Sequence, residues 1–355
     1  TGGSLPRVYT VDLREELKQG NRSIFSRKLQ ELLEDRLKKG QQGMLFINRR
    51  GFAGFVSCRA CGHVMKCPHC DVSLSQHRGG RLVCHYCGYE TPDVTACPEC
   101  GSGYISGFRA GTQQIEERLK AMFPNMRVLR MDADTTRTKD SHGQILAAFA
   151  AGEADVLVGT QMIVKGHDFP NVTLVGILAA DLSLNQNDYR AGERTFQLLT
   201  QAAGRAGRGG KPGEVVIQTY QPEHYSIVHA ARQDYKSFYE EEIAYRELMQ
   251  YPPAAHMLAV LVTSREQAQG ERLCEGMAGV VDSLRTQDGW QRLQVIGPAE
   301  ASIGKINDLY RHVFYMKHPD YQMLVEIKDE LERFCKTAEL KTQTVQYDFD
   351  PMNAY

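Results

Sequence analysis

Short apolar runs alternate with helical patterns over residues 1–220, apart from one cysteine-rich block. "GMLFINRR" at 43–50 is typical of a buried strand, and "GTQQIEERLKAMF" at 111–123 places apolar residues at helical spacing. Further strands are expected in "RVLRMDAD", "ADVLVGT", "VTLVGILAAD" and "GEVVIQTY", with helices in "SHGQILAAFAAGE" and at about 191–205. This alternation predicts an α/β fold with a mainly parallel sheet and helices on both faces.

The cysteine-rich block lies between the strand at 43–50 and the helix at 111–123. A folded sheet tolerates an insertion at such a position because the ends of a surface loop can remain close together. We therefore expect an α/β domain formed by residues 1–52 and 101–222, with a separate module inserted at 53–100.

The pattern changes after about residue 222. "YKSFYEEEIAYRELMQ" is an aromatic-rich helical segment that ends before Pro252 and Pro253, and a diproline cannot continue a helix. We expect a linker helix within residues 223–253. Residues 254–355 then show strand and helix patterns in the order β-α-β-β-α-β, which is typical of a ferredoxin-like α+β domain.

The composition indicates a folded protein without a membrane partner. The 355 residues are 42% hydrophobic and suffice for two or three domains, yet no stretch approaches the roughly twenty apolar residues of a spanning helix. The formal net charge is −1, so contact with nucleic acid would come from local basic patches. The start "TGGSLPRVYTVDL" lacks an initiator methionine and suggests a cut upstream of a domain or the remnant of a tag.

Eight of the ten cysteines form four C-x-x-C pairs. Two intervening residues let both sulfurs face one ion while turn amides support the thiolates, and two such pairs complete a tetrahedral zinc site. The alternatives are disulfides and an iron–sulfur cluster. Adjacent C-x-x-C disulfides belong to redox enzymes, and iron–sulfur proteins usually lack such regular pairs. We expect two zinc ions, both structural, because four thiolates leave no open position for water.

The spacing also predicts how the pairs combine. The stretch "DVSLSQHRGGRLV" between the second and third pairs is hairpin-like, which would bring these two pairs together and leave the first and fourth at the base of the insertion. Cys274 and Cys335 lie alone in helical patterns and are expected in the core. Nested pairing predicts one site from Cys58, Cys61, Cys97 and Cys100 and another from Cys67, Cys70, Cys84 and Cys87.

Two stretches carry side chains suited to phosphate. "VLVGTQMIVKGHDF" ends a strand near Thr160 and continues to Asp168, and "QLLTQAAGRAGRGG" places Arg205 and Arg208 at the end of a helix. Ligands collect at the carboxyl ends of parallel strands, so we expect these groups to converge on one edge. Each alone has a simpler interpretation: a helix end favoured by its dipole, a turn cap or an ordinary strand end. No G-x-x-x-x-G-K-[ST] phosphate loop occurs in the chain.

Together these stretches resemble a known family. "GMLFINRR", "VGTQMIVKGHDFPNV" and "QLLTQAAGRAGRG" are similar to the second RecA-like lobe of superfamily 2 helicases, the last two resembling its motifs V and VI. The eight-cysteine insertion and the ferredoxin-like domain are similar to those of the replication-restart helicases in that superfamily. The resemblance covers essentially the whole chain. It implies that a first lobe, with the phosphate loop and the acidic motif for magnesium, precedes Thr1.

The resemblance implies a role for each residue of the nucleotide site. Arg208 would be the finger that neutralises charge on the transferring phosphoryl group, with Arg205 beside it. Gln201 would join this cluster, and Asp168 would hydrogen-bond the ribose of ATP. ATP and Mg would bind the complete protein, and this chain alone would not hydrolyse ATP.

DNA contacts are expected at two places. By resemblance, Thr160 and the helix start at Gly111 and Thr112 would hold DNA phosphates. In the carboxyl-terminal domain, the loop "ASIGKINDLYRH" combines basic and aromatic residues that suit phosphate contact and base stacking, although a solvated loop is an equal alternative. The candidate residues of this loop are Lys305, Tyr310 and Arg311.

The resemblance implies an ATP-dependent 3′–5′ DNA helicase that recognises stalled replication forks and starts primosome assembly. The implied partners are forked and single-stranded DNA, single-stranded DNA-binding protein, and primosome or helicase-loader proteins. The implied location is the bacterial cytoplasm, in association with the nucleoid. The rival hypothesis is a stand-alone zinc-dependent DNA-binding or scaffold module without catalytic activity.

Overall fold

Contacts within the chain define two compact units. The computed structural model describes residues 5–47, 55–69, 72–77, 80–85, 87–107, 111–132, 135–136, 141–160, 163, 169–186, 188–207, 211–286, 290–338, 340, 342–353 and 355. The first unit comprises residues 1–64, 94–186 and 190–238, and the second comprises residues 65–93, 187–189 and 239–355.

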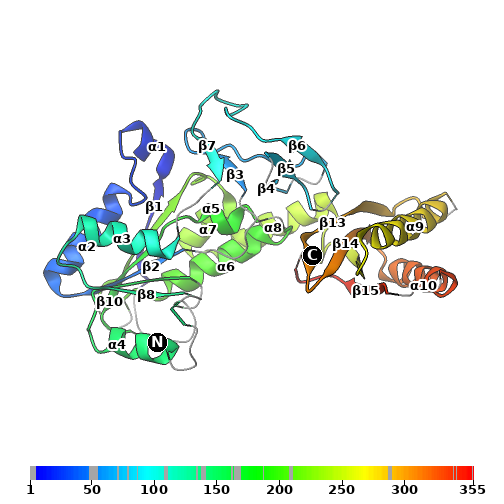
Figure 1. Ribbon diagram of the computed structural model, residues 1–355. Coiled ribbons are helices and arrows are strands. Elements are labelled where there is room, and N and C mark those ends of the chain that lie inside the picture. Colours follow the sequence, from blue (N-terminus) through cyan, green and yellow to red (C-terminus); the bar gives the residue numbers. More distant parts are fainter. Residues whose placement is uncertain are drawn as a thin grey trace. The chain divides into compact units, whose positions relative to one another are not determined.

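A six-stranded sheet forms the centre of the first unit (Figure 1). Its strand order is β1-β11-β10-β2-β9-β8, and every neighbouring pair is parallel. β2, β9 and β10 are buried along their whole length, as expected for central strands covered on both faces. The strands are β1 (Arg7–Asp12), β2 (Gln42–Phe46), β8 (Val128–Met131), β9 (Val156–Gly159), β10 (Val172–Ile177) and β11 (Glu214–Thr219).

Helices cover both faces of this sheet, so the predicted α/β layers are confirmed. α2 (Arg27–Lys39) and α3 (Thr112–Met122) pack on one face, and α4 (Ser141–Ala150), α6 (Ala191–Ala203) and α7 (Tyr225–Arg232) pack on the other. Two short helices follow strand ends: α1 (Leu13–Lys18) after β1, and α5 (Asp181–Leu184) after β10. Along β9, successive side chains alternate between the two hydrophobic clusters.

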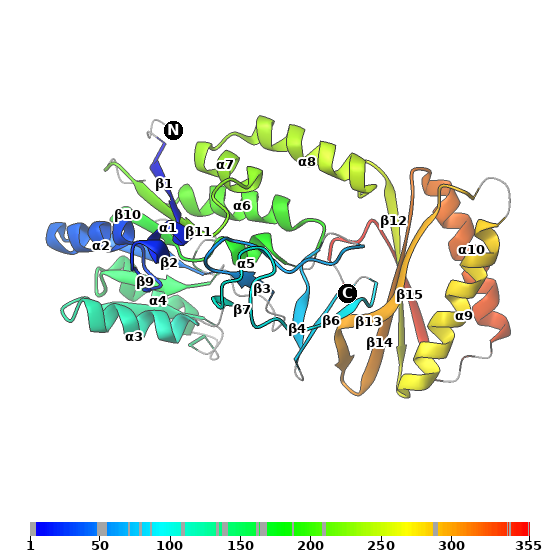
Figure 2. The same ribbon diagram turned by 90° about the horizontal axis from the view of Figure 1, so that it is seen from above.

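The second unit contains a four-stranded antiparallel sheet in the order β13-β14-β12-β15. α9 (Gln267–Arg285) and α10 (Tyr321–Thr337) lie against one face of it (Figure 2). This arrangement confirms the predicted β-α-β-β-α-β order. α8 (Tyr235–Met249) ends just before the diproline, also as predicted. The strands are β12 (His256–Ser264), β13 (Gln294–Ile306), β14 (Leu309–His318) and β15 (Thr344–Phe349).

The segment "ASIGKINDLYRH" is not a loop, which corrects the expectation. It forms the end of β13 and the start of β14, joined by a two-residue turn. Asn307 and Asp308 have φ angles of 48° and 62°, as in the type I′ turns that suit the twist of a hairpin. The apolar residues on both sides of this turn continue the two strands.

The inserted segment is divided between the units rather than grouped as one module. β3 (Val56–Cys58) and β7 (Ile105–Gly107) pair in the first unit. β4 (Ser75–His77), β5 (Arg81–Val83) and β6 (Glu90–Pro92) form a small sheet in the second unit, and β4 and β5 pair as the expected hairpin.

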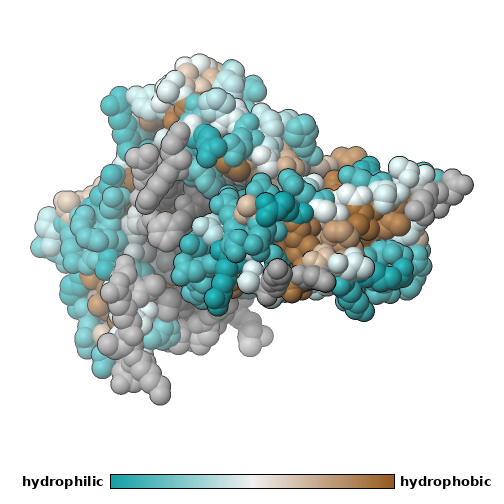
Figure 3. Space-filling model, turned by 45° about the vertical axis from the view of Figure 1, so that its right-hand side comes forward, coloured by the Kyte–Doolittle hydropathy of each residue, from teal (hydrophilic) through white to brown (hydrophobic). Residues whose placement is uncertain are grey.

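One face of the molecule can be followed in a space-filling view. Most of the face coloured in Figure 3 is hydrophilic, with apolar residues gathered on its right-hand side. Among the helices in the described part of the chain, none is both long and apolar enough to cross a bilayer.

Candidate metal centres and two candidate ligand-binding edges

The outer cysteines come together in the first unit. The Sγ atoms of Cys58 and Cys100 are 3.7 Å apart, and those of Cys61 and Cys97 are 3.6 Å apart. All four sulfurs lie within 4.8 Å of one another. A tetrahedral zinc ion with Zn–S bonds of about 2.3 Å requires sulfurs about 3.8 Å apart, so this arrangement fits the ion.

Repeated turns shape three of the C-x-x-C pairs. In each, the N–H of a glycine four residues after the first cysteine donates to the carbonyl of that cysteine, at 2.9 Å. These glycines, Gly62, Gly88 and Gly101, have φ angles of 84°, 76° and 70°, a region that favours glycine. A Cβ on Gly62 would also lie 2.4 Å from the carbonyl oxygen of Tyr220, so the first pair packs closely against the end of β11.

Metal binding to these cysteines would be coupled to proton release. Burial, opposed by a hydrogen bond from the backbone of His63, raises the pKa of the Cys61 thiol to about 12. A thiol with this pKa is neutral at pH 7. Because the thiolate is the form that binds zinc, metal binding would release the proton.

The inner cysteines come together in the second unit. The sulfurs of Cys67, Cys84 and Cys87 lie within 4.8 Å of one another, and those of Cys67 and Cys87 are 3.6 Å apart. Cys70, the predicted fourth ligand, lies outside the described residues. The backbone N–H of Cys67 donates to Val72, and that of Cys84 donates to Tyr89, as in the outer pairs.

Two predicted DNA-binding positions lie at the carboxyl edge of the six-stranded sheet. Thr160 directly follows β9 and is half-buried. Gly111 is the N-cap of α3 without a side-chain hydrogen bond, and the hydroxyl of the next residue, Thr112, donates to Asp132 just beyond β8. A phosphate bound by Thr112 would therefore compete with this carboxylate.

Arg205 lies at the opposite edge, which corrects the expectation that it converges with Thr160. α6 contains 13 residues and returns along the sheet for about 20 Å toward the start of β11. In the turn that follows, Gly207 N–H donates to the carbonyl of Val172, the first residue of β10, at 3.0 Å. A helix that joins parallel strands runs antiparallel to them, so its carboxyl end reaches the amino edge.

Of the other predicted nucleotide-binding residues, the structure describes Gln201 but not Asp168 or Arg208. Gln201 is exposed on α6, one turn before Arg205, which is half-buried. Asp168 and Arg208 lie outside the described residues. The structure therefore brings Gln201 and Arg205 to one helix end and leaves the other two positions undescribed.

The predicted DNA-binding residues of the second unit lie on the β13–β14 hairpin. Lys305 is opposite Tyr310, with its Nζ 4.8 Å from the ring centroid and 3.1 Å from Asp308 Oδ1. Arg311 follows Tyr310 in the strand and so projects from the other face. Its Nη1 donates to the carbonyl of Ile303 at 2.9 Å.

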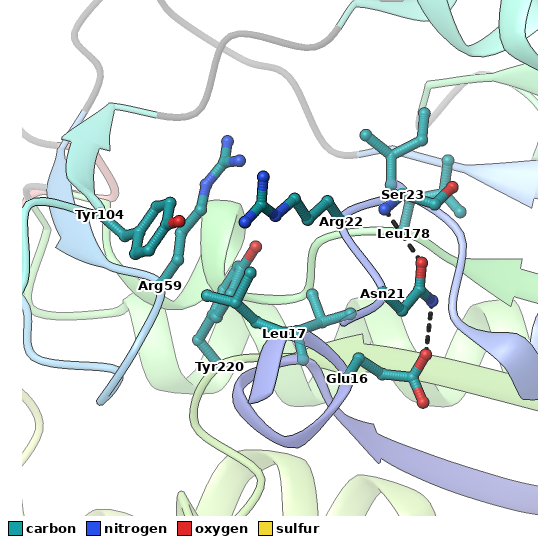
Figure 4. Close-up of a pocket in the computed structure, with 11 residues that line it drawn as sticks. Glu16, Leu17, Asn21, Arg22, Ser23, Arg59, Tyr104, Leu178 and Tyr220 are labelled. Carbon is teal, nitrogen blue, oxygen red and sulfur yellow. Dashed lines mark hydrogen bonds between the residues drawn. The ribbon is translucent and has the colours of Figure 1, made fainter. Parts of the chain in front are cut away.

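One pocket of the first unit was not predicted from the sequence. It lies at the carboxyl ends of β10 and β11, and its lining includes Arg22, Arg59, Tyr104 and Tyr220 (Figure 4). These residues are far apart in the sequence and belong to no shared motif. The nearest available signal was the first cysteine pair, "CRAC", in which Arg59 directly follows a predicted metal ligand.

Three family models match the chain. Residues 104–210 match the helicase conserved C-terminal domain, and residues 67–92 match the PriA DNA helicase Cys-rich region domain. Residues 247–352 match the primosomal protein N C-terminal domain. The Cys-rich match and the two cysteine clusters together support zinc binding by this segment.

Similar proteins match the chain over nearly its whole length. It is 47% identical over 349 residues to the replication restart protein PriA of Bacillus subtilis (strain 168), covering 98% of the chain and 43% of that protein. It is 44% identical to the protein of the same name from Synechocystis sp., covering 98% of the chain and 42% of that protein. The chain thus spans less than half the length of these relatives. A solved structure of RecG bound to a three-way DNA junction matches 71% of the chain and 23% of RecG, with 14% identity and a TM-score of 0.37.

Proposed function

Because the chain belongs to the replication restart protein PriA family, we propose that it is the carboxyl-terminal part of an ATP-dependent 3′–5′ DNA helicase. In this proposal the complete protein recognises stalled replication forks and initiates primosome assembly. Forked and single-stranded DNA, single-stranded DNA-binding protein and helicase-loader proteins are its partners in the bacterial cytoplasm, near the nucleoid.

The separation of two candidate sites on one sheet is the observation that carries this proposal. The candidate phosphate contacts Thr160 and Thr112 lie at the carboxyl edge, and Arg205 lies at the amino edge. A helicase needs both a DNA site and a nucleotide site, and it must connect them mechanically. The buried strands β2, β9 and β10 connect the two edges over roughly 15 Å.

The nucleotide site is proposed to be shared with another lobe of the complete protein. Phosphoryl transfer needs a bound triphosphate, magnesium and positive charge at the transferring group. Arg205 and Arg208 would supply the charge, with Asp168 and Gln201 contacting the nucleotide. ATP and Mg would be held mainly by the other lobe. Two structural zinc ions would hold the inserted segment, one in each cysteine cluster.

Steady-state ATPase activity tests this function. The complete protein should hydrolyse ATP faster with forked DNA than without DNA, whereas the 355-residue chain should show no DNA-stimulated turnover. A complete protein that binds forked DNA but hydrolyses no ATP would instead favour the rival scaffold function.

A further inference from the structure

Two arginines, Arg22 and Arg59, line the unpredicted pocket at the carboxyl edge. Its walls come from α1, the loop before α2, the first cysteine pair and the ends of β10 and β11. In Figure 4 the guanidinium groups of Arg22 and Arg59 point toward one another, beside the rings of Tyr104 and Tyr220. Within the part of the chain that the structure describes, neither guanidinium group has a hydrogen-bonding or ion-pairing partner.

The pocket retains this positive charge because its carboxylate is engaged elsewhere. Among the described lining residues, Glu16 is the one acidic side chain. Its Oε2 accepts from Asn21 Nδ2 at 2.6 Å and from the backbone N–H of Arg27 at 2.9 Å. The side chain of Arg27 also pairs with this carboxylate, at 3.2 Å. Two unpaired guanidinium groups favour an anion with several oxygens.

Local hydrogen bonds hold the pocket in shape without a ligand. Ser23 N–H donates to Asn21 Oδ1 at 3.0 Å, and Phe25 N–H donates to Ser23 Oγ at 3.1 Å, which fixes the loop that carries Arg22. On the other wall, Arg59 N–H donates to the carbonyl of Tyr104 at 2.9 Å. A preformed site loses less conformational entropy on binding.

We propose that this pocket binds one nucleotide unit of single-stranded DNA, with the phosphate between Arg22 and Arg59 and the base stacked on Tyr104. The ring of Tyr104 is available for stacking because this residue is 50% exposed. A basic groove with an aromatic platform binds single strands without sequence preference. The choice of DNA as ligand rests on the proposed function.

The position of the pocket supports a strand that continues along the edge. Leu178, in the pocket wall, follows β10, and Thr160 follows β9 two strands away in the sheet. Neighbouring strands are about 4.8 Å apart, so these positions are separated by roughly 10 Å. One DNA strand that crosses the carboxyl edge can therefore reach both.

Fluorescence anisotropy with a labelled oligothymidine, measured on the full 355-residue chain over a range of salt concentrations, tests the pocket. Replacing both arginines, Arg22→Gln with Arg59→Gln, should weaken binding about tenfold at low salt. The logarithm of the association constant falls as log[salt] rises, and the magnitude of this slope should decrease by about 0.7 for each phosphate that the chain no longer neutralises. Tyr104→Ala should weaken binding by roughly tenfold with an unchanged slope, and Tyr104→Phe should bind like the wild type.

A matched control removes the same charge from the same unit. Arg118 on α3 and Arg232 on α7 are both exposed and lie outside the pocket, so Arg118→Gln with Arg232→Gln should leave oligothymidine affinity nearly unchanged. Equal decreases in affinity in the two double variants would overturn the pocket while leaving DNA binding by the chain intact. A chain that binds no oligothymidine at low salt would overturn both the proposed pocket and DNA binding by this chain. Pocket-dependent binding of labelled hexaglutamate, with oligothymidine unaffected, would assign the pocket to an acidic protein partner instead.

Discussion

The two edges of the six-stranded sheet are built in different ways. Segments from across the sequence meet at the carboxyl edge: α1, the first cysteine pair, the start of α3 and the ends of four strands. At the amino edge, Arg205 is brought in by a single helix end. The comparison indicates that Gln201 and Arg205 depend on one local motif, whereas the candidates at the carboxyl edge depend on the tertiary fold and on the outer cysteine cluster.

Loss of the outer metal should have the largest effect, and it should fall on the carboxyl edge. Cys97→Ser removes one of the four sulfur ligands of the outer site, so the zinc content should fall from two ions to one. The loss should be costly, because structural zinc contributes apparent free energies of roughly 10 kcal/mol or more to the folding of small domains. Since Gly62 packs against Tyr220, the pocket beside it should lose oligothymidine affinity. Zinc analysis by mass spectrometry and anisotropy measure the two effects.

The inner cluster supplies the matched control. Cys87→Ser should also remove one zinc ion, but this cysteine belongs to the second unit, so the pocket should keep its affinity. Equal loss of oligothymidine binding in both variants would contradict the dependence of the carboxyl edge on the outer cluster.

The next largest effect concerns the amino edge. In the complete protein, Arg208→Ala should slow ATP turnover by roughly a thousandfold while changing nucleotide affinity by less than about tenfold, because the arginine acts mainly in the transition state. Arg205→Ala should behave similarly. Arg205→Ala should not alter oligothymidine affinity, since Arg205 lies at the edge opposite Thr160. Turnover and anisotropy measured on the same preparations check this separation.

Thr160→Val provides the reciprocal control for the two edges. It removes one candidate phosphate-binding hydroxyl at the carboxyl edge, so DNA affinity should fall while turnover at saturating DNA stays close to normal.

The arginine prediction has a simpler alternative, in which the arginines only favour the end of the helix. That alternative predicts that Arg208→Ala loses about 0.3 to 1 kcal/mol of stability and keeps normal turnover.

A smaller effect should come from the buried carboxyl group behind the pocket. Asp181 accepts hydrogen bonds from the hydroxyl of Thr219 and the N–H of Tyr220, and burial raises its pKa to about 6. The unfolded chain loses this proton near pH 4, so this group favours the folded state most at low pH. That contribution is lost as the pH rises from about 4 to 6, and it amounts to at most about 3 kcal/mol.

The matched variant isolates this contribution. Asp181→Asn keeps an acceptor but removes the titration, so its free energy of unfolding, measured with urea, should change less between pH 4 and 6 than that of the wild type. Identical pH profiles for the two proteins would contradict the assignment.

Local patterns were sufficient to predict the layers of the fold but not the positions of all candidate ligands. Buried strands such as β9 and β10 are apolar runs, and the β4–β5 hairpin follows from the spacing between cysteine pairs. Thr160 and Arg205 were expected at one edge because ligands collect at the carboxyl ends of parallel strands. Thr160 follows a strand, but Arg205 follows a helix that runs in the opposite direction. The direction of α6 follows from the parallel strands that it joins, so the sequence already implied that Arg205 lies at the amino edge.

Other features depend on long-range contacts and had no sequence signal. Arg22 and Arg59 meet only after α1, the loop before α2 and the first cysteine pair pack at the ends of β10 and β11. The division of the inserted segment between two units is likewise a matter of packing, since the cysteine spacing is the same whichever unit each pair joins.

The smallest expected effect concerns the β13–β14 hairpin, which tests whether DNA contacts extend beyond the first unit. Lys305 and Tyr310 share one face of this hairpin, whereas Arg311 projects from the other and already donates to Ile303. Lys305→Ala with Tyr310→Ala should lower oligothymidine affinity severalfold and reduce the salt slope by about 0.7, the value for one phosphate that is no longer neutralised. Arg311→Ala should have little effect, because its side chain is on the wrong face to bind the same nucleotide. The exposed pair between Lys305 and Asp308 contributes little to folding, so the double variant should remain folded. Equal and unchanged affinities in both variants would leave the hairpin as a solvated element and confine the DNA contacts of this chain to the carboxyl edge of the sheet.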